Sequence, residues 1–458
     1  MSRLVQIRSS LRPDGKHEPI VPADVSGRFT RARRVVFFVL IWIYAALPWV
    51  HIGGHPAVFL DLETRHFYLF GGIFDARDVW MMTFLLTGLV FTLLVVTALL
   101  GRAWCGWACP QTVFVDGVYR RIERLFQGSR EVHRRRDAGP WTASRILRKI
   151  GTHAGYAIVS LLLANVAISY FVSLPRLFQM MQRSPAEHAE AFGVMAVFAG
   201  LLYFDLGWFR EQFCVVMCPY GRLQSVLLDQ DSLVIGYDEK RGEPRGKLHA
   251  EGAGDCVDCN RCVAVCPTGI DIRNGLQLDC IACTACVDAC DEIMDRTKRP
   301  RGLVRYDSQR GLGGGKTRLL RPRLALYALL LAAGGGAAAF AFSRHADIEA
   351  VLTRLPGAPF SVDGDQVQNS FELLVTNKRS HAMPLRVEGE APAGAQFILP
   401  QGSVTLAPLE QMHRPLFVRV PRGATGTAAE VRLRVLDDHG SVVARATAPF
   451  LSPPPVAP

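Results

Sequence analysis

The residues best suited to do chemistry are twelve cysteines, eight of which lie between residues 256 and 290. They form two successive C-x2-C-x2-C-x3-C runs, the spacing of bacterial two-cluster ferredoxins. In that pattern three cysteines of one run and the last cysteine of the other run hold one [4Fe-4S] cubane. The spacing therefore predicts two [4Fe-4S] clusters, one on Cys256, Cys259, Cys262 and Cys290, and one on Cys280, Cys283, Cys286 and Cys266.

Zinc is the competing interpretation of this segment, because Zn²⁺ also accepts four thiolate ligands. The doubled spacing, with Pro267 directly after Cys266, favours iron–sulfur clusters. Cys290 is followed by Asp291, where a ferredoxin run usually has proline, but that residue shapes the turn and is not a ligand. We therefore expect the segment to transfer electrons.

The other four cysteines form a weak internal repeat of the motif C-x3-C-P. Cys105 and Cys109 lie in GRAWCGWACPQTVF, and Cys214 and Cys218 lie in REQFCVVMCPYGRL. If helix continues to the second cysteine, each pair places both sulfurs on one helix face, although the following prolines disfavour helix just before them. Such a pair suits a soft cation better than an intrahelical disulfide.

Three interpretations of these four cysteines stay open at this point. They could pack as small apolar side chains, converge on one shared site for a further metal or cluster, or bind Cu(II) and release Cu(I). The motif does not name the metal. His51, His55 and His66 offer imidazoles for a second copper site, although a structural role suffices for them.

The elements that must position these cysteines are membrane helices. Of the 458 residues 49% are hydrophobic and only 20% are charged, which favours a membrane protein over a soluble enzyme or a disulfide scaffold. Uncharged apolar runs predict five transmembrane helices near 35–51, 79–100, 155–174, 192–209 and 324–342. Asp205 lies in the fourth, and an intramembrane carboxylate is a functional candidate, although a hydrogen-bonded role near the span end suffices.

Basic residues alternate between the segments that join these helices. The 101–154 loop holds 11 Lys and Arg and the 51–78 loop holds 2. The positive-inside rule then places the cytoplasmic N-terminal segment 1–34, the 101–154 loop and the 210–323 segment inside, and the C-terminal domain outside. The net charge of +11 thus reflects topology, and we expect no nucleic-acid partner. All twelve cysteines fall on the reducing side, where thiols stay free.

From residue 346 to residue 458 the sequence changes to short alternating runs. In AEVRLRVLDD, Val431, Leu433 and Val435 share one face of a strand. About 100 such residues predict an immunoglobulin-like sandwich without a disulfide. The predicted fold is thus a multi-pass α-helical membrane protein with an inserted bacterial two-cluster ferredoxin (α+β) domain, at about 250–300, and a C-terminal all-β immunoglobulin-like domain.

Over nearly its whole length the chain resembles the membrane polyferredoxins of the cytochrome c oxidase accessory protein family, called CcoG, FixG or RdxA. The most specific parts are WCGWACPQTVFVD at 104–116, CVVMCPYGRLQSVL at 214–227 and the eight clustered cysteines. The resemblance implies a cupric reductase of the bacterial inner membrane that supplies Cu(I) for assembly of a cbb-type haem–copper oxidase. It also implies copper binding by Cys105, Cys109, Cys214 and Cys218.

The same resemblance implies copper chaperones or other oxidase assembly factors as partners, besides a cytoplasmic electron donor that the sequence does not identify. The oligomeric state is left open, a homodimer included. Two other functions compete with copper reduction. One is a respiratory subunit that passes electrons between quinol and a partner, and the other is a non-redox scaffold that binds copper.

Overall fold

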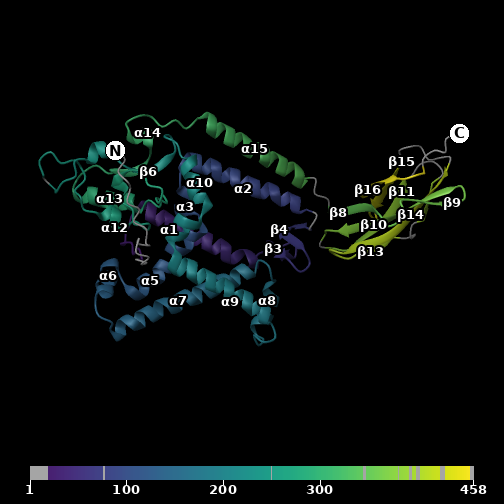
Figure 1. Cartoon of the computed structure of the whole chain (residues 1–458), viewed down its shortest axis with the longest axis horizontal. Coiled ribbons are helices and arrows are strands. Elements are labelled where there is room, and N and C mark those ends of the chain that lie inside the picture. Colours follow the sequence, from purple (N-terminus) through teal and green to yellow (C-terminus); the bar gives the residue numbers. More distant parts are fainter. Residues whose placement is uncertain are drawn as a thin grey trace. The chain divides into compact units, whose positions relative to one another are not determined.

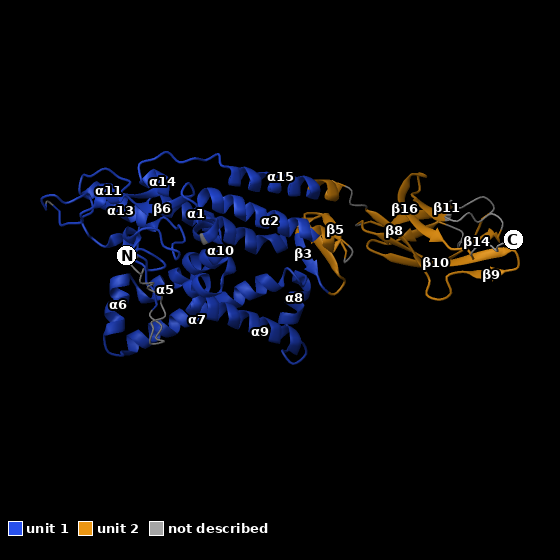
Figure 2. Cartoon of the chain, turned by 45° about the horizontal axis from the view of Figure 1, so that its top comes forward, with its two compact units in different colours: residues 1–50, 58–62, 82–338 blue, residues 51–57, 63–81, 339–458 orange. Residues whose placement is uncertain are grey.

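The computed structural model describes residues 19–75, 78–248, 250–343, 347–379, 381–390, 395–398, 403–422 and 429–453. The chain divides into two compact units, which are coloured separately in Figure 2. Unit 1 consists of residues 1–50, 58–62 and 82–338, and unit 2 consists of residues 51–57, 63–81 and 339–458. Of the predicted cytoplasmic segment 1–34, residues 1–18 lie outside the described residues.

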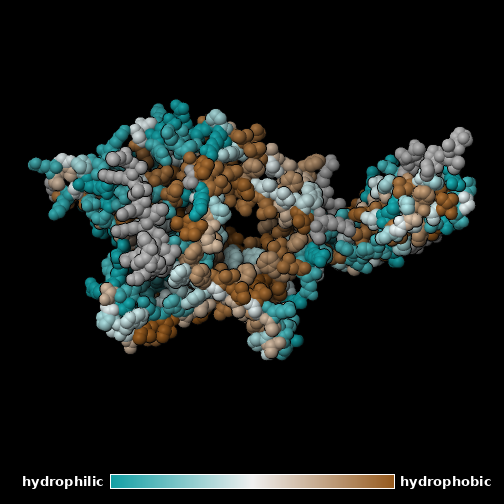
Figure 3. Space-filling view, in the orientation of Figure 1, coloured by the Kyte–Doolittle hydropathy of each residue, from teal (hydrophilic) through white to brown (hydrophobic). Residues whose placement is uncertain are grey.

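Among the described residues five helices are long and apolar enough to cross a membrane, which confirms the predicted multi-pass class. They are α1 (Arg28–Ala46), α2 (Val79–Leu100), α7 (Ala143–Ile168), α9 (Ala189–Phe204) and α15 (Pro322–Ser343). Helices α2 and α15 run side by side in both views (Figures 1 and 2). Figure 3 shows hydrophobic residues gathered over these helices and hydrophilic residues at the end that contains α13 and β6.

Two of these helices begin earlier than their apolar runs. Helix α1 begins at Arg28 rather than at residue 35, and α7 begins at Ala143 rather than at residue 155. The added turns are polar, and helix propagates through such residues once the apolar part has nucleated it. In α7 the side chain of Thr142 also caps the new start by accepting a hydrogen bond from the Arg145 N–H.

The segments around the C-x3-C-P motifs are short helices with π-helical turns, which are rare and often mark functional sites. After α2 come α3 (Ala103–Trp107), α4 (Pro110–Phe114), the π-turn η2 (Val115–Tyr119), α5 (Arg120–Gln127) and α6 (Arg130–Ala138). Helix α8 (Leu174–Met181) precedes α9, and the π-turns η3 (Asp205–Phe209) and η4 (Phe213–Met217) and helix α10 (Pro219–Leu227) follow it.

The ferredoxin segment is closed by an antiparallel pair of strands, β6 (Leu233–Tyr237) and β7 (Val304–Ser308), which flank the predicted 250–300 range. Between and after them lie α11 (Glu239–Gly242), α12 (Arg261–Ala264), the 3-10 turn η5 (Ile272–Asn274), α13 (Ala285–Arg296) and α14 (Gln309–Leu312). Ile235, Val287 and Met294 pack with several of the cysteines in one apolar core.

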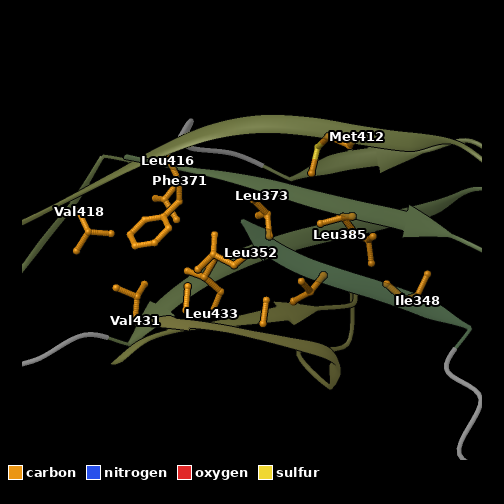
Figure 4. Close-up of a cluster of buried hydrophobic side chains, with 14 of the residues drawn as sticks. Ile348, Leu352, Phe371, Leu373, Leu385, Met412, Leu416, Val418, Val431 and Leu433 are labelled. Atoms are coloured by element: carbon orange, nitrogen blue, oxygen red, sulfur yellow. The ribbon is translucent and has the colours of Figure 1, made fainter. Parts of the chain in front are cut away.

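The C-terminal domain is a two-layer β-sandwich, as predicted. One sheet has the order β12–β14–β10–β8 with β9 on β10, and the other has the order β13–β11–β15–β16. Their strands are β8 (Ile348–Arg354), β9 (Ser361–Asp363), β10 (Gln366–Asn377), β11 (Met383–Glu390), β12 (Gln396–Ile398), β13 (Val404–Leu406), β14 (Gln411–Pro421), β15 (Ala429–Leu436) and β16 (Val442–Phe450). Phe371, Leu416 and Leu433 meet between the sheets (Figure 4).

Short strands lie between α1 and α2, after the 3-10 turn η1 (Leu47–Trp49). They are β1 (His51–Ile52), β2 (His55–Pro56), β3 (Val58–Asp61), β4 (His66–Leu69) and β5 (Gly72–Phe74). In unit 2 the buried Lys378 ammonium lies 2.6 Å from Asp78, 2.9 Å from Glu349 and 3.6 Å from Asp75. These ion pairs connect the end of the segment between α1 and α2 to strand β8.

Helix α13 of the ferredoxin segment caps the first transmembrane helix. Buried Asp288 accepts hydrogen bonds from the Phe29 N–H at 3.3 Å and from the Thr30 N–H and hydroxyl at 2.7 Å. An acidic side chain at a helix N-terminus satisfies free N–H groups and complements the helix dipole. The ferredoxin segment is thereby fixed to the membrane helices.

We predict that Asp288→Ala loosens this attachment at a cost of about 1–2 kcal/mol, the usual range for a lost N-cap. The purified protein should lose its visible iron–sulfur absorption at a lower temperature during heating in detergent. Asp288→Asn keeps one acceptor oxygen, so its iron–sulfur absorption should disappear at a temperature closer to that of the wild type. Equal bleaching temperatures for all three proteins would show that the cap does not hold the segment.

Candidate metal centres

The two ferredoxin runs share an unusual backbone pattern. In each run the residues on both sides of the middle cysteine have positive φ: Asp258 (50°) and Asn260 (54°) around Cys259, and Ala282 (53°) and Thr284 (64°) around Cys283. Left-handed conformations are uncommon outside glycine, and in a β-branched residue such as Thr284 they are strained. Alternating right- and left-handed residues turn successive N–H groups to one side and form an anion-binding concavity. The pattern fits an anionic thiolate-bound cluster.

The eight ferredoxin cysteines gather in two groups. Cys290 lies within electrostatic range of Cys256, Cys259 and Cys262. A cavity with an otherwise mainly apolar lining is bordered by Cys266, Cys280, Cys283 and Cys286, and Cys262 of the first group also reaches it. The groups adjoin, because Cys286 is also within range of Cys262. These are the two ligand sets that the spacing predicts, and their assignment as ligands stays a prediction.

The thiols of these groups are adapted to a cofactor rather than to water. Burial raises the pKa of Cys280 and of Cys290 to about 12, and that of Cys262 to about 11. Iron binding must therefore displace protons from them. Among the described residues no three His, Cys, Asp or Glu side chains could hold a single metal ion.

Helix does not continue to the second cysteine of either C-x3-C-P pair, so the condition for both sulfurs to share one helix face is not met. Helix α3 ends at Trp107, and Cys109 is extended (φ −62°, ψ 127°) as the N-cap of α4. Cys218 is likewise extended (φ −71°, ψ 109°) before α10. The ring of a following proline disfavours helix at the preceding residue, and that proline takes the first helical position of the next helix.

The structure nevertheless brings all four C-x3-C-P cysteines together. Cys214 lies within electrostatic range of Cys105, Cys109 and Cys218. The Cys105 thiol donates a hydrogen bond to Gln224 Oε1 at 3.3 Å, and burial raises its pKa to about 12. All twelve cysteines are free thiols. The geometry thus favours one site built from two pairs over two separate sites.

This four-cysteine group abuts the ferredoxin segment at Gly106. A Cβ atom on Gly106 would clash with the Ile281 carbonyl oxygen and lie 2.9 Å from the Cys283 nitrogen. The Gly106 carbonyl accepts a hydrogen bond from Arg33 Nε at 2.6 Å, and Arg33 also pairs with Asp116 at 2.6 Å. Sequence analysis missed Gly106 because a glycine between two cysteines has no signal of its own without an alignment.

Two other candidates occupy different places. Asp205 begins η3, and its Oδ1 accepts a hydrogen bond from Gln111 Nε2 at 3.0 Å. The Asp205 carboxyl group is also within electrostatic range of Cys214. It is therefore next to the four-cysteine group. His51 and His55 lie in unit 2 on the paired strands β1 and β2, and His55 stacks on Tyr68 with ring centroids 4.4 Å apart. Among the described residues, neither histidine belongs to a group of three or more side chains that could hold a metal ion.

Comparison with known proteins agrees with this architecture. Family models match residues 209–309 as a 4Fe-4S dicluster domain, residues 81–131 as a 4Fe-4S binding domain, and residues 338–453 as the immunoglobulin-like fold at the C-terminus of FixG. RdxA of Cereibacter sphaeroides is 34% identical over 445 residues, which is 92% of this chain and 94% of RdxA. RdxB of the same organism is 31% identical over 438 residues, 91% of each chain.

The nitrogen fixation protein FixG of Rhizobium meliloti is 39% identical over 303 residues, 64% of this chain and 57% of FixG. The crystal structure of a FixG-related protein from Vibrio parahaemolyticus covers 23% of this chain and 97% of its own at 14% identity, with a TM-score of 0.21 that adds no argument. Fold and cysteine groups define a membrane iron–sulfur electron-transfer protein. The chain belongs to the FixG/CcoG/RdxA family.

We predict that Gly106→Ala separates the four-cysteine group from the second ferredoxin run, because the new methyl group meets backbone atoms that cannot rotate away. The purified protein should contain less iron and should bind the remaining clusters less tightly under a chelator. Gly88→Ala in α2, where a Cβ meets nothing within 4 Å, is the matched control and should keep wild-type iron. Wild-type iron content and chelator resistance in Gly106→Ala would contradict the contact.

Proposed function

We propose that this protein is a cupric reductase that receives single electrons in its ferredoxin segment and uses them to reduce Cu(II) to Cu(I) at Cys105, Cys109, Cys214 and Cys218. The observation that carries the proposal is the gathering of these four partly buried thiols beside the second ferredoxin run. Thiolates prefer Cu(I) to Cu(II), so a site of this kind stabilises the reduced product. The proposed use of the Cu(I) is assembly of a cbb-type haem–copper oxidase, after transfer to a chaperone or another assembly factor.

The proposed electron balance is one electron for each copper ion. When bound, each [4Fe-4S] cluster supplies reversible one-electron chemistry. A low-potential one-electron donor in the cytoplasm reduces the ferredoxin segment, and one electron then converts one Cu(II) into Cu(I). The chain's own residues contribute the thiolate ligands and partly bury them, and the thiols release their protons when copper binds.

The proposed orientation has the N-terminus and both ferredoxin runs in the cytoplasm and the β-sandwich in the periplasm of the bacterial inner membrane. It is supported by the 11 Lys and Arg of the 101–154 loop against 2 in the 51–78 loop. The five apolar helices are consistent with termini on opposite sides. Free thiols are also stable in the reducing cytoplasm.

A second candidate is a third cluster on the same four cysteines. It is favoured by the family model for a 4Fe-4S binding domain at residues 81–131, which covers Cys105 and Cys109, and by the absence of a preformed single-ion group in the described residues. In that case the protein would be a three-cluster electron carrier, which suits exchange with a quinol or another redox partner.

We predict coupled reactions when Cu(II) and a Cu(I)-selective chromophore are added to anaerobic, pre-reduced protein. Reoxidation of the clusters and appearance of Cu(I) should proceed together in the wild type. Replacing Cys105, Cys109, Cys214 and Cys218 by alanine should abolish Cu(I) formation while the ferredoxin clusters stay reduced. Clusters that stay reduced in the wild type, in the presence of Cu(II), would exclude the cupric reductase.

Iron content separates the second candidate from the first. Two cubanes require about eight irons per chain, and three require about twelve. We predict about eight in the wild type, and the same number after alanine replaces the four C-x3-C-P cysteines. A loss of about four irons in that variant would establish the third cluster instead.

A further inference from the structure

Arg102 lies between the four-cysteine group and the second ferredoxin run. One terminal nitrogen of its guanidinium donates a hydrogen bond to the Leu278 carbonyl, just before Cys280. The other donates to the Gly221 carbonyl at 2.6 Å, just after Cys218. A planar guanidinium with donors in a fixed fork suits this bridging role, and a lysine ammonium does not reproduce it.

The charge of Arg102 faces thiols on both sides. It is within electrostatic range of Cys105 and of Cys280. Asp279 is the carboxyl group within its range, and Arg102 forms no ion pair with a carboxylate in the part of the chain that the structure describes. Its positive charge is therefore available to offset negative charge on the two thiol groups.

The first ferredoxin run is held differently. Its cation, Arg273, is neutralised by Asp258 at 2.6 Å and by Asp271 at 2.7 Å. Cys259, its middle cysteine, is exposed, whereas Cys283, its counterpart in the second run, is buried. The backbone that meets Gly106 also belongs to the second run. The two runs thus differ at their middle cysteines: Cys259 of the first run is exposed, whereas Cys283 of the second run is buried where its backbone meets Gly106.

We propose that Arg102 is a positioning residue that joins the second ferredoxin run to the C-x3-C-P cysteines, so that electrons enter at the first run and leave through the second. Its guanidinium holds the two backbones together, and its charge stabilises the more negative, reduced state of the second cluster. This inference rests on the proposed function only for the identity of copper as the acceptor.

A redox titration of the purified full-length protein, monitored by EPR, tests whether the charge of Arg102 stabilises the reduced second cluster. Removing a positive charge disfavours the reduced, more negative cluster. Arg102→Gln should therefore lower the midpoint potential of the second cluster only. That cluster is identified as the one whose EPR signal changes in Cys280→Ser and does not change in Cys256→Ser. Arg102→Lys should keep that potential. Arg121→Gln, an exposed arginine of α5, is the control and should shift neither cluster.

The rate of Cu(I) formation from pre-reduced protein tests the two hydrogen bonds that the Arg102 guanidinium donates to the Leu278 and Gly221 carbonyls. Both Arg102→Gln and Arg102→Lys should be slower than the wild type by about tenfold or more, which corresponds to about 1.4 kcal/mol. Arg102→Lys at the wild-type rate, an equal shift of both clusters, or a shift confined to the cluster altered by Cys256→Ser would overturn the inference. A wild type that forms no Cu(I), together with the predicted shift, would overturn the proposed function and leave the role of Arg102 supported.

Discussion

The rest of the structure depends on the direct backbone contact at Gly106. The C-x3-C-P thiols and the thiols of the second ferredoxin run approach each other only because no side chain separates Gly106 from the Ile281–Cys283 backbone. Packed interiors leave no room for an added methyl group without displacement. Short helices and π-turns deliver the cysteines to this point, since an uninterrupted helix would carry the second cysteine of each pair elsewhere.

The surrounding elements serve to hold this contact in place. Asp288 fixes α13 to the start of α1, and Arg120 of α5 donates to the Pro267 carbonyl at 2.8 Å. These anchors make the ferredoxin segment an integral part of unit 1 rather than a tethered carrier. The β-sandwich has its own apolar core, and all twelve cysteines lie outside it.

Much of this organisation could be predicted from the sequence. Apolar runs gave the five spans, alternation at Val431, Leu433 and Val435 gave a strand of the sandwich, and cysteine spacing gave two groups of thiols. The sequence predicts these features because each of them depends on residues that are close together in the chain. The convergence of Cys105 with Cys214, and the parts played by Gly106 and Arg102, depend on tertiary packing and had no local signal. Pro110 and Pro219 end the helices before the second cysteine of each pair, as the preference of a residue before proline for extended backbone predicts.

X-ray absorption at the copper and iron edges, on protein loaded with one Cu(I) under anaerobic conditions, tests the central claim most directly. We expect copper with sulfur ligands only, and loss of that copper when Cys105, Cys109, Cys214 and Cys218 are replaced by alanine. The iron-edge spectrum should be that of cubane clusters and should not change on this replacement. Copper bound through nitrogen or oxygen, or an iron spectrum altered by the same replacement, would contradict it.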